Sequence, residues 1–284
     1  MADYVEIFEV GPRDGLQNEA RMIPAQEKIS LVDLLSQAGF RRIEVASFVS
    51  PKWVPQMADG AEVLGGIKRM AGVSYAALTP NMKGFERAMA AGADEIAIFG
   101  SASEGFSQAN INCSISESLE RFEAVVGAAN VRKVKVRGYV SCITDCPYDG
   151  PTPPEAVAGV VERLLAMGCY EVSLGDTIGR ATPQSTARML ERVLEVADAR
   201  HLAGHFHDTG GQALENITVA LDMGLRVFDG AIGGLGGCPY APGAAGNVAS
   251  EKVMSHLEAL GYQTGLHRDV LEKAAKMARD MRAG

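Results

Sequence analysis

Residues 171–207 read EVSLGDTIGRATPQSTARMLERVLEVADARHLAGHFH, and this stretch decides the fold. It holds a β-rich run at 171–174, a segment with helical spacing at 183–197 and a second β-rich run at 202–207. Strands that alternate with helices of this length predict βαβ units, in which neighbouring strands run parallel.

The same unit recurs along the whole chain. The sequence predicts eight strands, at residues 5–10, 42–47, 73–78, 95–100, 134–141, 171–174, 202–207 and 226–232. Between them lie helical segments, at residues 25–38, 82–91, 118–129, 154–167, 183–197 and 211–223. Eight such units have the size of a (β/α)8 barrel. A doubly wound sheet is the alternative, but GPRDG after the first strand lacks the phosphate-binding glycine pattern of that fold.

We therefore expect an α/β protein: a (β/α)8 TIM barrel with extra C-terminal helices. The barrel is expected over about residues 5–260 and the helical extension over about 266–284, within a single catalytic domain over 1–284. In such a barrel the catalytic groups lie at the carboxyl ends of the strands.

Composition excludes several classes of protein. The 284 residues carry 27 basic and 35 acidic side chains, a net charge of −8, which argues against nucleic-acid binding. No apolar stretch approaches the roughly 20 residues of a membrane helix, and the first residues lack a basic, apolar leader. The five cysteines do not have the spacing of a disulfide framework. We expect a cytoplasmic protein with no membrane or nucleic-acid partner.

Two histidines at the end of a predicted strand indicate a metal site. His205 and His207 are two residues apart, so their side chains point to the same face of the strand. Asp14, just past the first strand, supplies a carboxylate, and Asn247 is a further candidate at the expected start of the last barrel helix. Such mixed ligands suit Mg²⁺ or Mn²⁺. The alternatives are a hydrogen-bonded histidine pair, a turn aspartate and an asparagine that caps a helix.

Other polar residues cluster at the same strand ends. Arg13 either forms a structural ion pair or stabilises an oxyanion on the substrate. Glu44, at the second strand, is either its partner or a proton-transfer group. The segment GGLGGCPYAPG after the last strand can close over a ligand, and Cys238 within it serves in acid–base chemistry, gating or redox sensing, or is simply an exposed thiol.

Four motifs resemble the 3-hydroxy-3-methylglutaryl-CoA lyases. They are VGPRDGLQNE at 10–19, SFVSPKWVPQM at 47–57, SLGDTIG at 173–179 and GGLGGCPY at 233–240. The resemblance covers nearly the whole chain. It implies a metal-dependent lyase that cleaves 3-hydroxy-3-methylglutaryl-CoA to acetyl-CoA and acetoacetate, in leucine degradation and ketone body formation. It also implies a homo-oligomer, a dimer or larger.

The resemblance also implies roles for individual residues. The metal ligands would be Asp14, His205, His207 and Asn247; the catalytic residues would be Arg13, His205, Cys238 and Glu44; and Gln17, Ser47, Gly236 and Gly237 would serve in cofactor binding. Arg13 would stabilise the thioester enolate, and His205 would protonate it. Glu251 matches a further acidic position near the site.

Three other functions remain open at this stage. A related lyase would act on a longer branched 3-hydroxyglutaryl-CoA. A Claisen-type synthase would condense acetyl-CoA with a 2-oxo acid, although such synthases commonly carry further C-terminal domains. A non-catalytic binding protein would use the same scaffold, because a fold alone does not guarantee activity.

Overall fold

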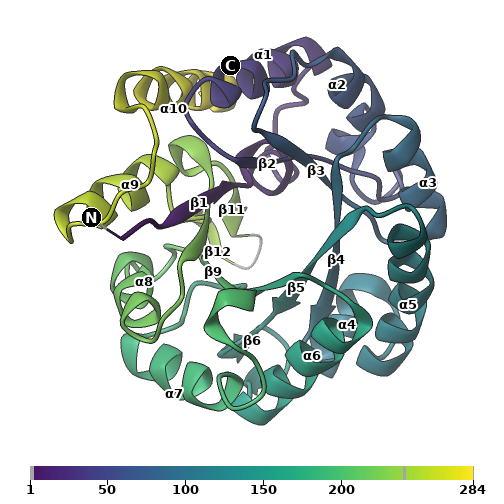
Figure 1. The fold of residues 1–284 in the computed structure, drawn as a ribbon, viewed down its shortest axis with the longest axis vertical. Helices are drawn as coiled ribbons and strands as arrows, with labels where there is room; N and C mark the ends of the chain where they lie inside the picture. Colours follow the sequence, from purple (N-terminus) through teal and green to yellow (C-terminus); the bar gives the residue numbers. More distant parts are fainter. Residues whose placement is uncertain (1–2, 239–240, 284) are drawn as a thin grey trace.

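Eight parallel strands close into a barrel, in the order β1-β10-β9-β8-β5-β4-β3-β2 (Figure 1). They are β1 Glu6–Glu9, β2 Arg42–Ser47, β3 Ser74–Leu78, β4 Glu95–Ser101, β5 Lys135–Ser141, β8 Glu171–Asp176, β9 Leu202–Phe206 and β10 Val227–Gly230. This computed structural model describes the backbone of residues 3–238 and 241–283. Side chains are described for the same residues except 237, 238, 241–245 and 283. The prediction of a TIM barrel is confirmed.

Helices surround the barrel. Those that follow the strands are α1 Ala25–Ser36, α2 Gly60–Gly66, α3 Met82–Ala90, α5 Ile115–Val131, α6 Pro154–Met167, α7 Pro183–Val193, α8 Ala213–Asp222 and α9 Ser250–Ala259, with a short α4, Glu104–Ile111, before α5. The extension is α10, Arg268–Ala283, which packs against α1. None of the helices in the described ranges has the length and apolar character that a bilayer crossing requires.

Local chemistry explains where the elements begin and end. The expected helix at 118–129 begins earlier, at Ile115, because Ser114 and Glu117 form a capping box. The side chain of Ser114 accepts the Glu117 N–H, and Glu117 accepts the Ser114 N–H. Helix α6 ends as expected, because Gly168 adopts the left-handed conformation that glycine tolerates.

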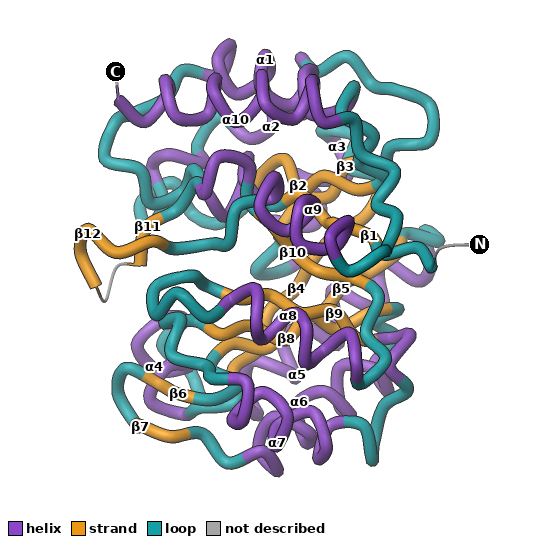
Figure 2. Tube along the Cα trace, turned by 90° about the vertical axis from the view of Figure 1, so that its left-hand side faces the viewer, coloured by secondary structure: helices purple, strands orange, loops and turns teal. Residues whose placement is uncertain are grey.

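Two small hairpins stand at the carboxyl end of the barrel. One pairs β6 Asp145–Cys146 with β7 Gly150–Pro151, and the other pairs β11 Gly237–Cys238 with β12 Ala241–Ala245. Figure 2 shows both on the side of the molecule opposite the N-terminus. The second hairpin lies in the glycine-rich segment for which the sequence predicts only a loop that can close over a ligand.

The barrel interior contains a row of opposite charges. Arg42 contacts Glu171, with 3.0 Å between guanidinium and carboxylate, and Arg137 donates to Glu171 at 2.6 Å and to Asp229 at 2.7 Å. Arg137 is only 1% exposed, so its pairing offsets the cost of removing the charge from water. The row, which we call the charged chain, leads from one end of the barrel to His205 at the other.

Candidate active site

The Arg13–Asp14 pair lies in a π-helical turn, Gly11–Gly15, directly after β1. Arg13 is buried, and its guanidinium donates to Asp14 at 2.6 Å and twice to Glu44 of β2, at 2.9 and 2.6 Å. Tyr139 of β5 donates to the same Glu44 oxygen at 3.0 Å. The structure therefore places Glu44 as the partner that fixes Arg13.

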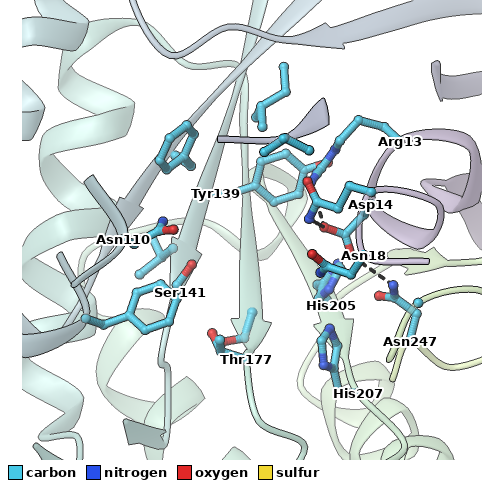
Figure 3. A pocket seen from close by; sticks show the side chains of 18 of the residues that line it. Arg13, Asp14, Asn18, Asn110, Tyr139, Ser141, Thr177, His205, His207 and Asn247 are labelled. Carbon is cyan, nitrogen blue, oxygen red and sulfur yellow. Dashed lines mark hydrogen bonds and ion pairs between the residues drawn. The ribbon is translucent and has the colours of Figure 1, made fainter. Parts of the chain in front are cut away.

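Asp14, His205 and His207 come together as expected. One potential ligand atom from each lies within 4.8 Å of the others, and Figure 3 shows the three side chains on one side of the pocket. Asn247 lies beside them and donates its amide N–H to Asp14 at 2.8 Å. The expectation that Asn247 begins the last barrel helix is wrong: α9 begins at Ser250, and Asn247 forms a β-bridge with His207 instead.

Asp229 orients His205. The register of the barrel pairs Asp229 of β10 with His205 of β9, and Nδ1 of the imidazole lies 3.1 Å from the carboxylate. Asp229 also accepts hydrogen bonds from Arg137 and Ser173. Burial lowers the pKa of His205, but the hydrogen bond and charge of Asp229 outweigh burial and leave that pKa raised. Because Nδ1 is committed to Asp229, Nε2 is the nitrogen left for the site.

The electrostatics of the other two residues suit a cation. Burial disfavours the charged form of Asp14, yet Arg13 and the two histidines lower its pKa to about 2, so it is a carboxylate at neutral pH. Burial, followed by the neighbouring His205, lowers the pKa of His207 to about 4 and keeps its imidazole neutral. Its buried Nδ1 has no hydrogen-bond partner among the described residues. The Asp14 carboxylate and the neutral imidazole of His207 are donors that divalent ions accept.

These groups line a cavity of about 320 Å³. Across the pocket from the metal-ligand candidates lie three polar side chains, those of Ser141, Thr177 and the exposed Asn110 (Figure 3). The apolar wall is formed by side chains from several strands and loops: Val49, Val54, Leu78, Phe99, Phe106 and Val140. The cavity therefore combines an apolar wall with a few charged and polar groups, as ligand-binding sites commonly do.

The remaining candidate residues occupy different places. Gln17 donates to Asp14 at 3.1 Å, and Gly236 lines the cavity. Ser47 is buried under the following loop, where its hydroxyl accepts the Val49 N–H. Gly237 and Cys238 form β11, and the position of the Cys238 side chain lies outside what the structure describes.

Glu251 lies just outside the cavity, in the first turn of α9. Its carboxylate accepts the Gly233 N–H at 3.0 Å. It therefore contacts the first residue of the glycine-rich segment rather than the metal-ligand candidates.

Sequence reasoning missed Asp229, Tyr139 and Glu9. An acidic residue inside an otherwise apolar strand was the available signal for Asp229. Glu9, at the end of β1, is fully buried and accepts the N–H groups of Gly11 and Ile232 and the hydroxyl of Ser250. It thereby ties the Arg13–Asp14 turn to the start of the glycine-rich segment and to α9.

The chain is similar in sequence to proteins named as lyases of 3-hydroxyglutaryl-CoA compounds. The chain is 57% identical over 272 residues to a 3-hydroxy-3-isohexenylglutaryl-CoA/hydroxy-methylglutaryl-CoA lyase of Pseudomonas aeruginosa, covering 96% of this chain and 91% of that protein. It is 59% identical over 263 residues to a cytoplasmic 3-hydroxy-3-methylglutaryl-CoA lyase of Danio rerio, covering 93% and 78%.

A solved structure matches over its full length. The crystal structure of the HMG-CoA lyase from Brucella melitensis superposes with a TM-score of 0.99, at 58% identity and with all of both chains covered. The family model described as HMGL-like matches residues 4–278. The match to the family model and the similarity to these relatives show that this chain belongs to the HMGL-like family.

Proposed function

We propose that the protein is a hydroxymethylglutaryl-CoA lyase, which cleaves 3-hydroxy-3-methylglutaryl-CoA to acetyl-CoA and acetoacetate. The observation that carries the proposal is the meeting of Asp14, His205 and His207 within 4.8 Å, with Arg13 hydrogen-bonded to Asp14 in the same cavity. Relatives with this named activity, similar over nearly the whole chain, support it.

The reaction breaks the bond between C2 and C3 of the substrate. The hydroxyl on C3 loses its proton and becomes the ketone of acetoacetate. C2 keeps the electron pair as a thioester enolate, and protonation of C2 then yields acetyl-CoA. The protein must therefore hold the hydroxyl for deprotonation, stabilise the oxyanion and deliver a proton.

Asp14, His205, His207 and Asn247 are the residues proposed to hold a divalent ion, Mg²⁺ or Mn²⁺. When bound, such an ion lowers the pKa of a ligated hydroxyl and orients the substrate. The buried Nδ1 of His207, without a partner among the described residues, and the low pKa of Asp14 support this assignment.

Arg13 and His205 are proposed to act on the acyl group. Glu44, which also accepts the Tyr139 hydroxyl, holds the Arg13 guanidinium in place, so Arg13 is preorganised to stabilise the enolate oxygen. His205 is a suitable acid for C2, because imidazole transfers protons near neutral pH. Both expected roles of His205 use Nε2, since Nδ1 contacts Asp229, so metal binding and proton delivery compete for one nitrogen.

The other expected residues would contact the acyl-CoA or cover it. Gln17, which donates to Asp14, and Gly236, which lines the cavity, are proposed to contact the acyl-CoA. We also propose Ser47 and Gly237 for such contacts. Cys238 is proposed to lie on the hairpin that covers the site.

A coupled assay tests the activity. Purified protein with 3-hydroxy-3-methylglutaryl-CoA and Mg²⁺ should form acetoacetate, and chelation should abolish that product. Absence of acetoacetate with both Mg²⁺ and Mn²⁺ present would refute the assignment. A panel of 3-hydroxyglutaryl-CoA homologues with longer substituents at C3 defines the acyl length that the apolar wall accepts.

The wider context is also proposed. We propose that the protein assembles as a homo-oligomer, a dimer or larger, and that it acts in the cytoplasm in leucine degradation and ketone body formation. Some relatives are named cytoplasmic and others mitochondrial, and the assembly and the pathway are proposed from the family resemblance alone. Light scattering of the purified protein measures its assembly directly.

A further inference from the structure

Helix α10 lies against the first four residues of the glycine-rich segment, 233–236. We call these four residues the base of the segment. Gly233 approaches this helix so closely that an added Cβ would lie 3.0 Å from the Ala275 carbonyl oxygen and 3.1 Å from the Ala278 Cβ. The extension is therefore in direct contact with a segment that reaches the active site.

Arg282, in the last turn of α10, holds one end of the base. Its guanidinium donates to Glu19 at 2.9 and 2.7 Å and to the carbonyls of Gly234 and Gly236 at 3.1 and 3.4 Å. The same Glu19 oxygen accepts the Gly236 N–H at 3.2 Å. The Glu19 side chain is 11% exposed and the Arg282 side chain 41%, so the carboxylate is largely shielded from solvent while the guanidinium lies at the surface.

Arg279, one turn earlier, repeats the arrangement at the other end. It contacts Glu251 at 3.5 Å, and the other oxygen of Glu251 accepts the Gly233 N–H at 3.0 Å. Arg282 and Arg279 are thus each joined to a backbone N–H of the base through one carboxylate. Two such bridges fix the first and last residues of the base.

The base contacts the metal-ligand candidates on its other side. The Leu235 carbonyl accepts the Asn247 amide at 3.3 Å. A Cβ on Gly236 would lie 2.9 Å from that same amide nitrogen and 3.3 Å from the Gly15 Cα. A shift of the base would therefore move Asn247, which hydrogen-bonds Asp14.

We propose that Arg282, together with Arg279, is a positioning residue for the active site: through Glu19 and Glu251, α10 holds residues 233–236, and with them Asn247 and Asp14, in the geometry that binds the divalent ion. The inference rests on the proposed function for its catalytic consequence alone. The bridges themselves are read from hydrogen bonds that do not depend on the substrate.

The test compares variants of the full-length protein. Arg282→Met and Glu19→Gln each remove one bridge, and Arg282→Lys keeps the charge without the planar fork that reaches two carbonyls. The matched control is Arg268→Met, because Arg268 also lies on α10 and pairs with Glu258 and Ser255 of α9, away from the base. The measurements are the Kd for Mn²⁺, hydrogen exchange of peptides covering 233–236, the melting temperature, kcat and KM.

The proposal expects a specific pattern. Arg282→Met should raise the Kd for Mn²⁺ and lower kcat by roughly tenfold each, as loss of a residue supporting a metal ligand does. Exchange at 233–236 should become faster, while the melting temperature matches that of Arg268→Met. Arg282→Lys should recover part of the loss. The double variant with Glu19→Gln should be no worse than the worse single variant, because both remove one bridge.

Other outcomes overturn the inference. If Arg282→Met and Arg268→Met have the same Mn²⁺ affinity and the same exchange at 233–236, α10 does not position the site. If Arg282→Met lowers the melting temperature below that of Arg268→Met and leaves the Kd for Mn²⁺ unchanged, the fall in kcat reflects lost stability and the role of Arg282 is structural. A wild-type protein that lacks lyase activity overturns the proposed function instead, and leaves the exchange and Mn²⁺ results to decide on the bridges.

Discussion

His205 has one nitrogen committed and one available, and this decides what a single substitution does. With Nδ1 at 3.1 Å from Asp229, His205→Asn removes the Nε2 that faces the ligand cluster. We expect kcat to fall by about 10³-fold or more while circular dichroism stays native. The Kd for Mn²⁺ in the same variant separates the two roles: an unchanged value means that His205 delivers protons without binding the ion. A near-normal rate would contradict both roles.

Arg13 is expected to act through its fixed charge. Arg13→Met keeps much of the side-chain volume but removes the donor proposed to stabilise the enolate, so kcat should fall by about 10²- to 10³-fold. It also leaves the buried Glu44 without its cation, which should lower the melting temperature. Arg13→Lys is the control for charge alone. If Arg13→Met lowers the melting temperature but leaves kcat unchanged, Arg13 serves only in its structural ion pair with Glu44.

Asp229 tests how far orientation of the imidazole matters. Asp229→Asn keeps the size of the side chain but removes the charge that holds both His205 and Arg137. We expect a drop of roughly 10- to 100-fold in metal affinity or turnover, the usual effect of altering the partner of a ligating histidine. Ser173→Ala, which removes only a hydroxyl donor to Asp229, is the milder control. Equal effects of the two variants would argue against orientation by charge.

Among the elements, β1 and α9 meet the glycine-rich segment at Glu9. Burial raises the pKa of Glu9 to about 8, more than its three hydrogen bonds lower it. From about pH 4.5 to 8 the folded protein keeps a proton that the unfolded chain loses. The free energy of unfolding should therefore fall as pH rises through this window, by at most about 5 kcal/mol, and level off above it.

Glu9→Gln isolates this contribution. The amide can keep both backbone contacts through its oxygen and donate to Ser250 through its nitrogen. Urea unfolding at pH 5, 6, 7 and 8 should show a weaker pH dependence for the variant than for the wild type. Parallel curves for the two proteins would show that Glu9 keeps an ordinary pKa in the fold.

At the scale of the whole molecule, a cation that binds only the folded state stabilises the whole chain. Mn²⁺ at 100 times its Kd should add about 2.7 kcal/mol to the free energy of unfolding, which raises the melting temperature by several degrees for a domain of this size. Asp14→Asn should abolish the increase. With EDTA the far-ultraviolet spectrum should stay native, because the barrel packs around side chains. A shift that persists in Asp14→Asn would place the ion elsewhere.

The barrel could be predicted because its signal is repeated eight times. Each predicted strand overlaps an observed one, and the C-terminal helix α10 lies within the extension expected over about 266–284. The Asp14–His205–His207 cluster could be predicted because parallel strands end at the same side of a barrel. Asn247 was placed on the wrong element, because its β-bridge to His207 depends on a contact between residues 40 apart in the chain.

Residues that act through tertiary contacts carried little local signal. Asp229 meets His205 only through the register of β10 against β9. Glu19 and Arg282 lie at opposite ends of the sequence and meet only when α10 packs beside α1. Short α2 and α4, of seven and eight residues, offer too few turns for a periodic pattern to stand out.

The charged chain inside the barrel limits how this protein can be redesigned. Each residue of this chain forms an ion pair with the next, in the order Arg42, Glu171, Arg137 and Asp229. Replacing one of them with an apolar side chain therefore leaves a neighbouring buried charge without its partner. A redesign that makes the barrel interior apolar would therefore have to replace all four residues together. A substitution at the floor of the barrel, far from any ligand, can thereby disturb the imidazole at its mouth.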